Sequence, residues 1–164
     1  MSETTRTAVT VYTDGGASPN PGLGGWAAVL LSPSHGAERE ISGAEEDTTN
    51  NRMELTAAIE ALRALKRPCR VDLHTDSTYL RNAFERGWLV KWRRNGWRTA
   101  AKEPVQNRDL WEELWGLAQT HEVRWHWVKG HAADQRNNRC DELVREARER
   151  FRASAGSAPW RSQS

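Results

Sequence analysis

The chain has 164 residues, with 24 Lys and Arg against 22 Asp and Glu, so its formal net charge is +2. Hydrophobic residues make up 37% and charged residues 28%, and nine tryptophans add large apolar surfaces for a core. This composition excludes wholesale disorder, and a single domain accounts for the length. The sequence has no apolar run of about 18 residues and no apolar leader, so we expect neither a membrane span nor a signal peptide.

The two cysteines, Cys69 and Cys140, are far apart in the sequence and form no CxxC pattern. We therefore expect no disulfide scaffold and no cysteine zinc site, but a reducing, cytoplasmic setting. Charge is distributed unevenly, because residues 86–98 contain five basic residues and no acid, while residues 38–60 contain seven acids and two bases. The basic segment indicates binding of an anion, and the acidic segment indicates that it holds something cationic.

The first part of the chain predicts three strands in succession. Residues 7–13 alternate between two faces, as in a strand, and the segment 17–25, ASPNPGLGG, is rich in turn residues. Residues 26–31 predict a second strand and residues 38–43 a weaker third. Short connections between the three favour an antiparallel meander.

Apolar residues then recur at helical spacing. A stripe from Leu55 to Leu65 predicts a helix, with Thr48 or Thr49 as its N-cap. The pattern next predicts a strand at 71–75, a helix at 77–86, a helix at 109–119, a strand at 123–128 and a helix at 137–152. We therefore predict one α/β domain over residues 7–152 with a five-stranded mixed sheet, a flexible N-terminus at 1–6 and a disordered tail at 153–164.

Two aspartates follow predicted strands at the edge where ligands of α/β proteins gather. Asp14 closes the first predicted strand, and Asp76 closes the fourth. Taken alone, Asp14 is equally typical of an Asp-Gly turn, and Asp76 of a helix N-cap.

Two further carboxylates are candidates on helices. Glu54 borders the apolar stripe of the first predicted helix, whereas Glu60 lies on its far side. Asp141 opens the last predicted helix, where an acid also stabilises the helix dipole. Four carboxylates in one crevice would repel one another unless cations lay among them, and Mg²⁺ suits oxygen ligands and phosphate substrates. Two such ions can activate a water and stabilise the leaving oxygen of a phosphodiester.

Four segments resemble sequence blocks of the bacterial type 1 ribonuclease H family, namely YTDGGASPNPGLGGWA, TTNNRMELTAAIEAL, HTDSTYL and WVKGHAADQRNNRCDELVREA. The likeness covers about residues 7–150, in order and in spacing. It implies a ribonuclease H-like fold and hydrolysis of the RNA strand of RNA–DNA hybrids, with 3′-hydroxyl and 5′-phosphate ends, and thus removal of RNA primers and R-loops. It also implies that two Mg²⁺ ions, or Mn²⁺ in their place, are bound by Asp14, Glu54, Asp76 and Asp141.

The resemblance implies further site residues. His131, in KGHAAD, matches a mobile-loop histidine that assists proton movement or product release, although a lone histidine in a polar loop is by itself typical of an exposed side chain. Contacts with the substrate are implied for Asn20, Thr49, Asn50, Asn51 and Thr78. Thr49, Asn50 and Asn51 are also typical of helix capping. Asp47 departs from this pattern, because a negative charge beside a phosphate site weakens it.

The segment WLVKWRRNGWRTAAK resembles the basic protrusion, or handle, of the family, at about residues 86–102. We expect its tryptophans to build the protrusion and its basic side chains to contact DNA phosphates. The residues predicted to contact substrate here are Trp88, Lys91, Trp92, Arg93 and Arg94. The alternative is that Trp88 and Trp92, four residues apart, pack on a neighbouring helix while the charges are merely solvated; the packing of the tryptophans is compatible with phosphate contacts by the basic side chains.

Three other functions fit the sequence less well. A catalytically inactive nucleic-acid-binding module would lack a carboxylate, and all four are present. Another nuclease or integrase of the same superfamily would not be expected to carry the handle and the His131 loop. A calcium-binding structural domain would need spacing such as DxDxDG, which the chain lacks. We expect a monomer that binds an RNA–DNA hybrid and needs neither a membrane nor an obligate protein partner.

Overall fold

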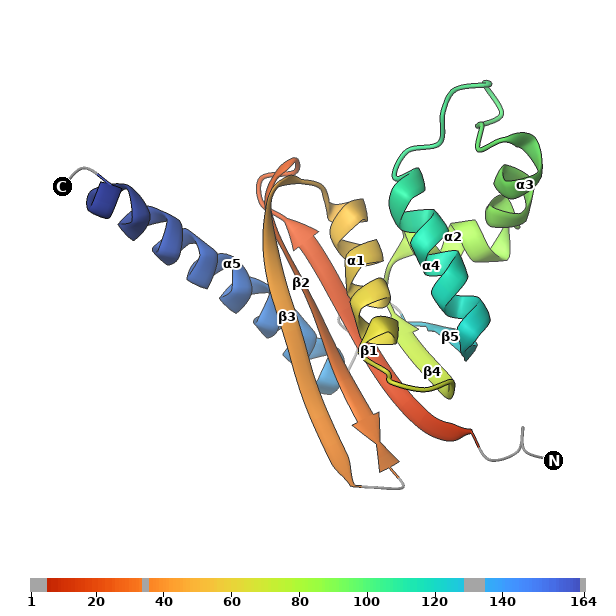
Figure 1. Ribbon diagram of the computed structural model, residues 1–164, viewed down its shortest axis with the longest axis horizontal. Coiled ribbons are helices and arrows are strands. Elements are labelled where there is room, and N and C mark those ends of the chain that lie inside the picture. The colour runs from red at the N-terminus through yellow and green to blue at the C-terminus, as the bar shows by residue number, and fades with distance from the viewer. Residues whose placement is uncertain (1–5, 34–35, 129–134, 163–164) are drawn as a thin grey trace.

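A computed structural model describes residues 6–33, 36–128 and 135–162, with side chains described as far as Ser154 in the last stretch. A five-stranded sheet forms the centre, and helices lie on both of its faces (Figure 1). The strands are β1 (Thr7–Ala17), β2 (Gly22–Ser32), β3 (Ala37–Thr48), β4 (Cys69–Thr75) and β5 (Glu122–Trp127). The helices are α1 (Asn50–Arg63), α2 (Thr78–Glu85), α3 (Trp88–Asn95), α4 (Arg108–Thr120) and α5 (Gln135–Ser162).

The sheet is mixed, in the order β3-β2-β1-β4-β5. The pairs β1–β2 and β2–β3 are antiparallel, whereas β4 runs parallel to β1 and β5 runs parallel to β4. Each parallel strand needs a crossover connection, which α1 supplies before β4 and α2 to α4 supply before β5. The predicted α/β fold, with a meander joined to parallel strands, is confirmed.

The core is divided between the two faces of the sheet by alternate residues of β1. Val9 and Val11 pack with the apolar stripe of α1 and with residues of α2 and α4. Tyr12 lies on the other face, where it packs with Cys140 and residues around it on α5. Because side chains alternate along a strand, Asp14 lies on the same face of β1 as Tyr12.

The hairpin between β1 and β2 is longer than the sequence pattern predicts. Backbone pairing continues until only residues 18–21 connect the strands, although the pattern predicts a turn over 17–25. Glycine is typical of turns and disfavoured in strands, which is why the pairing is hidden in the sequence. Asp14 therefore lies within β1, opposite Ala27, and does not close it. The parallel pairing of β1 with β4, however, stops at Tyr12.

Two of these glycines let helices approach the sheet closely. A Cβ atom on Gly15 would lie 2.5 Å from the backbone carbonyl of Met53 in α1. A Cβ atom on Gly25 would lie 2.6 Å from the carbonyl oxygen of Val144 in α5. Contacts this short are not possible for a real side chain, so glycine is required at both positions. The consequence is that α1 and α5 both pass near Asp14.

Helix α5 differs from the prediction at both ends. It begins at Gln135, and its backbone stays helical to Ser162, across residues 153–162 for which composition predicts disorder. The helix therefore extends past the predicted end at residue 152, through alanines that favour a helix and through Gly156 and Pro159, which oppose one. This part of α5 projects beyond the sheet (Figure 1).

Most of the predicted flexible segment 1–6 lies outside the described residues. Within the described ranges, no helix combines the length and the apolar character that a membrane crossing requires.

Candidate active site

Asp14 lies in β1, and Asp76 directly follows the end of β4, the parallel neighbour of β1. Tyr12 of β1 is paired with His74 of β4, and each aspartate lies two residues beyond this pair. Side chains two residues apart point to the same face of a sheet, so both carboxylates follow the same row. The charge of Asp76 contributes to raising the pKa of Asp14, so the two carboxylates lie close enough to interact.

Ser77 connects the start of α2 to Glu54. Its hydroxyl oxygen accepts the backbone N–H of Leu80 at 3.0 Å, which caps α2. The same hydroxyl donates to Oε1 of Glu54 at 2.5 Å. Asp76 is therefore not the helix cap, and the capping interpretation of that residue is wrong. Glu54 itself is half-buried on the part of α1 that passes over Gly15.

Glu60 lies in a different environment from Glu54, although both belong to α1. Its carboxylate pairs with the guanidinium of Arg63 at 2.8 Å, on the surface of the helix. The prediction that Glu54 borders the packed face and Glu60 lies on the far side is thus confirmed.

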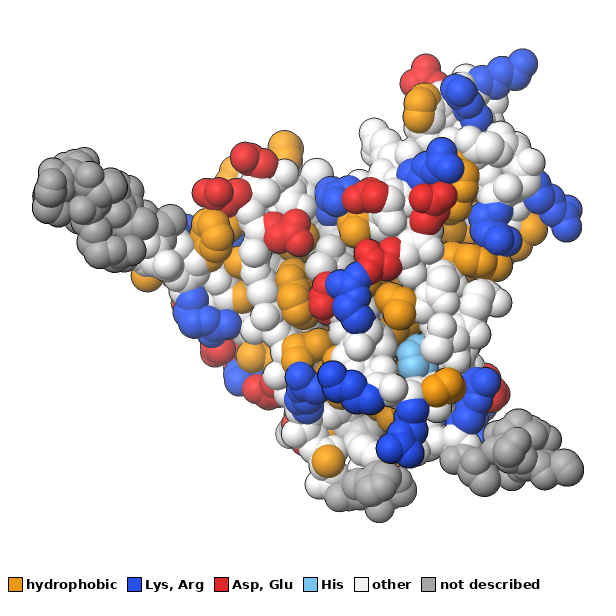
Figure 2. All heavy atoms as spheres, viewed as in Figure 1, with side chains coloured by type: hydrophobic (Ala, Val, Ile, Leu, Met, Phe, Trp, Pro, Cys, Tyr) orange, Lys and Arg blue, Asp and Glu red, His pale blue; other side chains and the backbone are white. Residues whose placement is uncertain are grey.

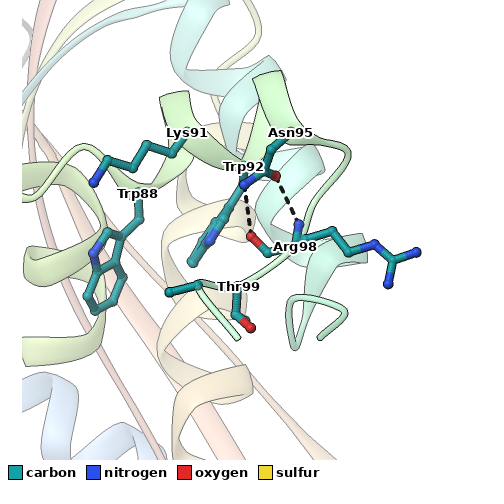
Figure 3. Close-up of a pocket in the computed structure, with 7 residues that line it drawn as sticks. Trp88, Lys91, Trp92, Asn95, Arg98 and Thr99 are labelled. Atoms are coloured by element: carbon teal, nitrogen blue, oxygen red, sulfur yellow. Dashed lines mark hydrogen bonds between the residues drawn. The ribbon is translucent and has the colours of Figure 1, made fainter. Parts of the chain in front are cut away.

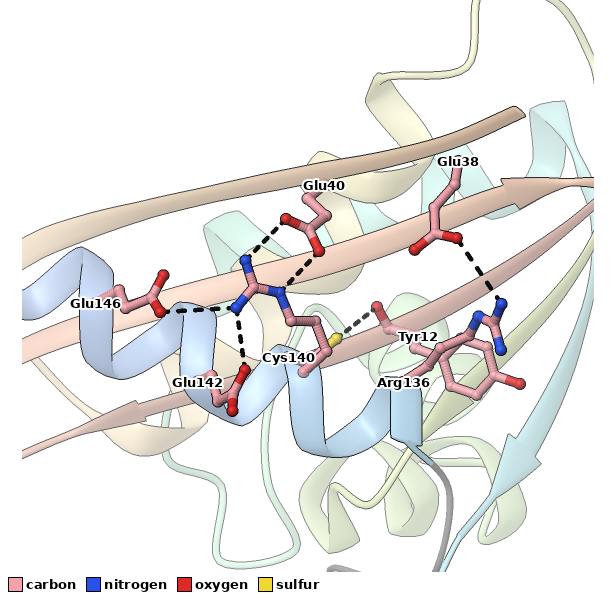
Figure 4. Close-up of polar contacts among 8 residues, drawn as sticks. Tyr12, Glu38, Glu40, Arg136, Cys140, Glu142 and Glu146 are labelled. Atoms are coloured by element: carbon pink, nitrogen blue, oxygen red, sulfur yellow. Dashed lines mark hydrogen bonds and ion pairs between the residues drawn. The ribbon is translucent and has the colours of Figure 1, made fainter. Parts of the chain in front are cut away.

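Asp141 reaches the same region from α5. The preceding residue, Cys140, is buried, and its thiol donates to the carbonyl oxygen of Tyr12 at 3.3 Å. Arg139 binds both carboxylate oxygens of Glu40 in β3, at 2.8 and 3.0 Å (Figure 4). These contacts attach the start of α5 to β1 and β3, and so determine where Asp141 lies.

Part of the acidic segment holds cations that belong to the chain itself. Glu38 pairs with Arg136 at 3.8 Å, and Glu40 pairs with Arg139 (Figure 4). The positive charge of Arg139 lowers the pKa of Glu40 below its ordinary value. The expected attraction for cations is therefore real, but these two glutamates dock α5, and within the acidic segment Glu54 alone belongs to the carboxylate site.

Burial and mutual repulsion disturb the ionisation of two of the four carboxylates. Burial raises the pKa of Asp14 from 3.8 to about 7, and the charges of Asp76, Asp141 and Glu54 raise it further, against a backbone hydrogen bond. Burial also raises the pKa of Glu54 from 4.5 to about 7, with a further contribution from Asp76 and opposition from the Ser77 hydroxyl. The four side chains are thus close enough to interact, and their arrangement favours a proton or a cation between them.

The carboxylates do not form a closed cage. Over the described ranges, no three side chains of the acidic, histidine or cysteine kind converge in a way that could hold an ion. Protein groups interact with these carboxylates, since Glu54 accepts from Ser77 and Asp141 pairs with the guanidinium of Arg145. The donor set consists of hard oxygen ligands, the kind that Mg²⁺ prefers.

A second polar region is a cleft of about 510 Å³ at the N-terminal end of α1. It is lined by Asn20, Pro21, Thr49, Asn50, Asn51, Gln106 and Asn107, and we call it the amide cleft. Thr49 and Asn107 are the N-caps of α1 and α4, so two helix N-termini meet here. Backbone N–H groups and the positive end of the helix dipole attract anions at such places. Four residues predicted as substrate contacts lie together in this cleft.

Asparagine carbonyl oxygens in the amide cleft are already occupied. Oδ1 of Asn50 accepts the backbone N–H of Ala17 at 2.7 Å, and Oδ1 of Asn20 accepts the backbone N–H of Asn50 at 3.0 Å. Oδ1 of Asn107 accepts from the guanidinium of Arg52 at 3.1 Å. The remaining side-chain groups of these asparagines are N–H donors. The cleft is therefore rich in donors and lined by uncharged residues, which suits a phosphate group.

The handle forms a separate basic region. Lys and Arg side chains gather over α3 and the loop that follows it (Figure 2). A hollow of about 400 Å³ here is lined by Trp88, Lys91, Trp92, Asn95, Arg98, Thr99 and Ala100 (Figure 3). The side chain of Asn95 closes the turn after α3, because it donates to the carbonyl of Arg98 and accepts from its N–H, each at 3.0 Å.

Tryptophan rings hold the handle on the domain. The ring of Trp92 lies 5.9 Å from that of Trp88, 6.1 Å from that of Trp97 and 5.7 Å from that of Trp111 in α4. Trp111 and Trp97 are buried, so the cluster connects the handle to the core. The interpretation that these tryptophans build the protrusion is confirmed.

The basic side chains of the handle differ in what they touch. The guanidinium of Arg93 lies over the ring of Trp115 in α4, 4.5 Å from its centroid. Lys91 lines the hollow, and both Lys91 and Arg94 are exposed. All three side chains are exposed, and Arg93 differs from Lys91 and Arg94 in that its guanidinium also packs on an aromatic ring.

Some residues predicted from the sequence lie apart from these regions. His131 falls outside the described residues. Thr78 is exposed at the start of α2 and is not part of the amide cleft lining. Asp47 lines a different hollow, with Leu23 and Phe151 among its neighbours, so its charge lies apart from the lining of the amide cleft.

Sequence reasoning missed several residues of the site. Ser77, Arg145, Gln106 and Asn107 were not singled out. Ser77 could have been found as the residue that caps α2, and Arg145 as a cation one helical turn beyond Asp141. Asn107 has no such signal, because its neighbours in the cleft come from distant parts of the chain.

Comparison with known sequences gives a consistent result. The RNase H family model matches residues 6–149. A protein named Ribonuclease H from Moorella thermoacetica is 61% identical over 140 residues, covering 85% of this chain and 90% of that protein. Another of the same name, from Chelativorans, is 54% identical over 155 residues, covering 94% of this chain and 88% of that protein.

Solved structures agree with the fold. The crystal structure of LC9-RNase H1, described as a type 1 RNase H with the type 2 active-site motif, has a TM-score of 0.76 at 30% identity. The match covers 88% of this chain and 73% of that chain. LC11-RNase H1, in complex with an RNA/DNA hybrid, has a TM-score of 0.67 at 24% identity, covering 87% of this chain and 98% of that chain. At that identity the second likeness establishes the fold.

Proposed function

Because this chain belongs to the ribonuclease H family, we propose that it hydrolyses the RNA strand of RNA–DNA hybrids with the help of divalent metal ions. The products would be 3′-hydroxyl and 5′-phosphate ends, and the cellular role would be removal of RNA primers and R-loops. One observation carries the proposal: Asp14, Glu54, Asp76 and Asp141 come from distant parts of the chain to one region, where burial first, and then the charges of neighbouring carboxylates, raise the pKa values of Asp14 and Glu54 to about 7.

The four carboxylates suit Mg²⁺, with Mn²⁺ as a substitute, because they offer hard oxygen ligands and excess negative charge. Asp141 also pairs with Arg145, one helical turn further along α5. When bound, two divalent ions supply Lewis-acid chemistry, which activates the attacking water and stabilises charge on the leaving oxygen.

The chain's own residues orient the reaction. The Ser77 hydroxyl, which also caps α2, donates to Oε1 of Glu54 at 2.5 Å. This hydrogen bond fixes the orientation of the carboxylate and therefore of its other oxygen, Oε2. Asp14 is held within β1 on the face of the sheet that packs against α5, where it is half-buried. A low-water site strengthens electrostatic interactions with a phosphodiester.

Recognition of the hybrid would use the amide cleft and the handle. In the amide cleft, Thr49, Asn50 and Asn51 lie at the N-terminus of α1, and their donors suit a backbone phosphate. Asn20 and Thr78 are proposed to read the 2′-hydroxyl side of the minor groove, where RNA differs from DNA. Trp88, Lys91, Trp92, Arg93 and Arg94 form the proposed contact with DNA phosphates, a role supported by the exposed charges of the handle.

His131 is proposed as an auxiliary group that moves a proton or helps product release. An imidazole titrates near neutral pH and can serve either purpose. We also propose a monomer that acts in the cytoplasm without an obligate partner. Both cysteines are buried free thiols, as expected in a reducing compartment.

The proposal is tested by a gel assay with one labelled strand, in Mg²⁺ and in EDTA. We expect the RNA of a hybrid to be cut in Mg²⁺, while single-stranded RNA and duplex DNA stay intact and EDTA stops the reaction. Uncut hybrid RNA, or cutting of duplex DNA, would overturn it.

A pair of variants on one helix sharpens this assay. Glu54→Gln should abolish cleavage at ordinary Mg²⁺ concentration, because it removes a proposed ligand. Glu60→Gln is the matched control and should cut like the wild type, because Glu60 pairs with Arg63 on the surface. Equal effects of the two substitutions would contradict the assignment of Glu54.

A further inference from the structure

Asn107 is an N-cap residue whose side chain does not cap its helix. Its backbone is left-handed, with φ of 62°, and its side chain makes no capping hydrogen bond. Asparagine at an N-cap ordinarily accepts a backbone N–H of the first turn. Left-handed backbone in a residue other than glycine costs energy and recurs at functional places. The side chain of Asn107 is thus withdrawn from its ordinary task.

Both ends of that side chain are held by other helices. Oδ1 accepts from Nη1 of Arg52 in α1 at 3.1 Å, and Nδ2 donates to the hydroxyl of Tyr79 in α2 at 3.1 Å. The Tyr79 hydroxyl also accepts Nε1–H of Trp111 at 3.0 Å, and the rings of Tyr79 and Trp111 lie 5.2 Å apart. Trp111 is fully buried, so this network is anchored in the core.

Arg52 is itself fixed in place. Its two terminal nitrogens bind both carboxylate oxygens of Asp109, at 3.2 and 3.0 Å. This pairing raises the pKa of Arg52 and lowers that of Asp109, so both stay charged over a wide range of pH. A bidentate contact of this kind has a defined geometry. Because Asp109 fixes the orientation of the Arg52 guanidinium, the hydrogen bond from Arg52 also fixes the orientation of the Asn107 amide.

One donor of Asn107 is left for a ligand. A side-chain amide carries two N–H groups, and the Tyr79 hydroxyl takes one of them. Asn107 lines the amide cleft with Thr49 and Asn50, where the other proposed phosphate donors lie. An amide that is held from both ends loses little entropy when it binds, so its hydrogen bond contributes more to affinity.

We propose that Tyr79 and Arg52 are positioning residues, which act through Asn107 to direct its second N–H toward a backbone phosphate in the amide cleft. The inference rests on the proposed function, because it assumes a nucleic-acid substrate. Tyr79 and Arg52 do not themselves touch the substrate. A network that merely joined α1, α2 and α4 would affect stability and leave recognition of a phosphate unchanged.

The test compares Tyr79→Phe with Trp111→Phe. Tyr79→Phe keeps the ring but removes the acceptor that holds Asn107, so the KM for a hybrid should rise by about 3- to 10-fold, the range of one hydrogen bond, with kcat retained. Trp111→Phe removes core volume and the indole N–H but keeps the bond between Tyr79 and Asn107. It should lower the melting temperature more than Tyr79→Phe does and raise KM less, because the hydrogen bond to Asn107 remains.

A second measurement uses hybrids in which one phosphate is replaced by a neutral methylphosphonate, at each position of each strand in turn. The result of this measurement does not depend on the stability of the protein. In the wild type and in Trp111→Phe, a methylphosphonate at one position of the hybrid should raise KM. In Tyr79→Phe, a methylphosphonate at the same position should raise KM little further, because the hydrogen bond to that phosphate is already lost. Arg52→Lys is a second variant. It keeps the positive charge but loses the planar guanidinium that binds Asp109 and Asn107 together, so it should behave like Tyr79→Phe.

A full methylphosphonate penalty in both Tyr79→Phe and Arg52→Lys would overturn the inference, as would a wild type that is insensitive at every position. Failure of the proposed function looks different, since the wild type would then leave unmodified hybrids uncut.

Discussion

The carboxylate site and the handle are both clusters of like charge, but the fold treats them in opposite ways. The four carboxylates are brought together by β1, α1, β4 and α5, and two of them have pKa values of about 7 because they are buried near one another. The cations of the handle lie on one helix and its loop, where Lys91 and Arg94 are exposed and Arg93 lies over Trp115. The fold therefore holds the carboxylates close together although their negative charges repel one another, whereas it leaves the basic side chains of the handle exposed to solvent.

This difference teaches what each region can do. A buried cluster of acids is costly without a counterion, so its effects should appear in chemistry, metal dependence and pH dependence. An exposed cluster of bases costs little and is screened by salt, so its effects should appear in affinity and in salt dependence. Variants in the two regions should therefore differ in kind as well as in size.

The largest effect is expected from Asp14→Asn. The substitution keeps the shape but removes one proposed metal ligand, so cleavage of a hybrid should fall by orders of magnitude. Without metal, the free energy of unfolding should hold or rise, because repulsion from Asp76, Asp141 and Glu54 is relieved. Urea denaturation in EDTA measures this. Asp47→Asn, which removes an exposed charge, is the control; cleavage by Asp14→Asn at a rate near that of the wild type would contradict the assignment.

A smaller effect is expected from pH on the metal-free fold. The pKa of Asp14 rises from 3.8, and that of Glu54 from 4.5, to about 7 on folding, so between about pH 4 and 7 the folded chain binds more protons than the unfolded chain. Their contribution to stability is full below pH 4 and is lost as the pH rises through 7. His121, whose pKa is lowered by burial, acts in the opposite direction near pH 6.5.

Melting temperatures in EDTA between pH 4 and 8 measure this dependence. Comparing the wild type with Asp14→Asn cancels the contribution of His121, and the wild type should lose more stability as the pH rises. Mg²⁺ should restore most of the loss at pH 8. Identical dependence of the melting temperature on pH in the two proteins would show that the pKa of Asp14 is not raised in the folded chain.

In the handle, Arg93 and Arg94 form a matched pair. Arg94→Ala should flatten the slope of log K against log[salt] for a hybrid by up to about 0.9, the value for one lost phosphate contact. Arg93→Ala should flatten the slope less and lower the melting temperature more, because the Arg93 guanidinium lies over Trp115. Hybrid affinity at several salt concentrations decides this; an unchanged slope for Arg94→Ala would mean that its charge is merely solvated.

The smallest effect is expected from a segment that belongs to neither region. Truncation after Ala153 removes the end of α5, which projects beyond the sheet (Figure 1). Activity and melting temperature should stay within error of the full chain. A clear drop in either would show that this segment stabilises the domain.

The fold could be predicted because its periodic signals are strong. The alternation in β1 and the apolar stripe of α1 are visible in the sequence, and the order of elements indicates a mixed sheet. Where prediction failed, tertiary contact had overridden local propensity. Gly15 and Gly25 are typical of a turn, yet both pair within strands because α1 and α5 pass over them.

The site was only partly predictable for a similar reason. Glu54 could be told from Glu60 by helical geometry alone. Asn107 could not be found, because its importance comes from Arg52 and Tyr79, which approach it from α1 and α2. A residue whose role depends on three distant segments leaves no local pattern in the sequence.

The spacing between two acids in this protein is determined by a missing methyl group. Gly15 has no side chain, and a Cβ there would lie 2.8 Å from the backbone nitrogen of Glu54. Any larger residue would lift α1 from β1 and carry Glu54 away from Asp14 without altering a single charge. For protein engineering, this means that transplanting the four acids onto another scaffold would not transfer the site, unless the glycine beneath the helix were copied with them.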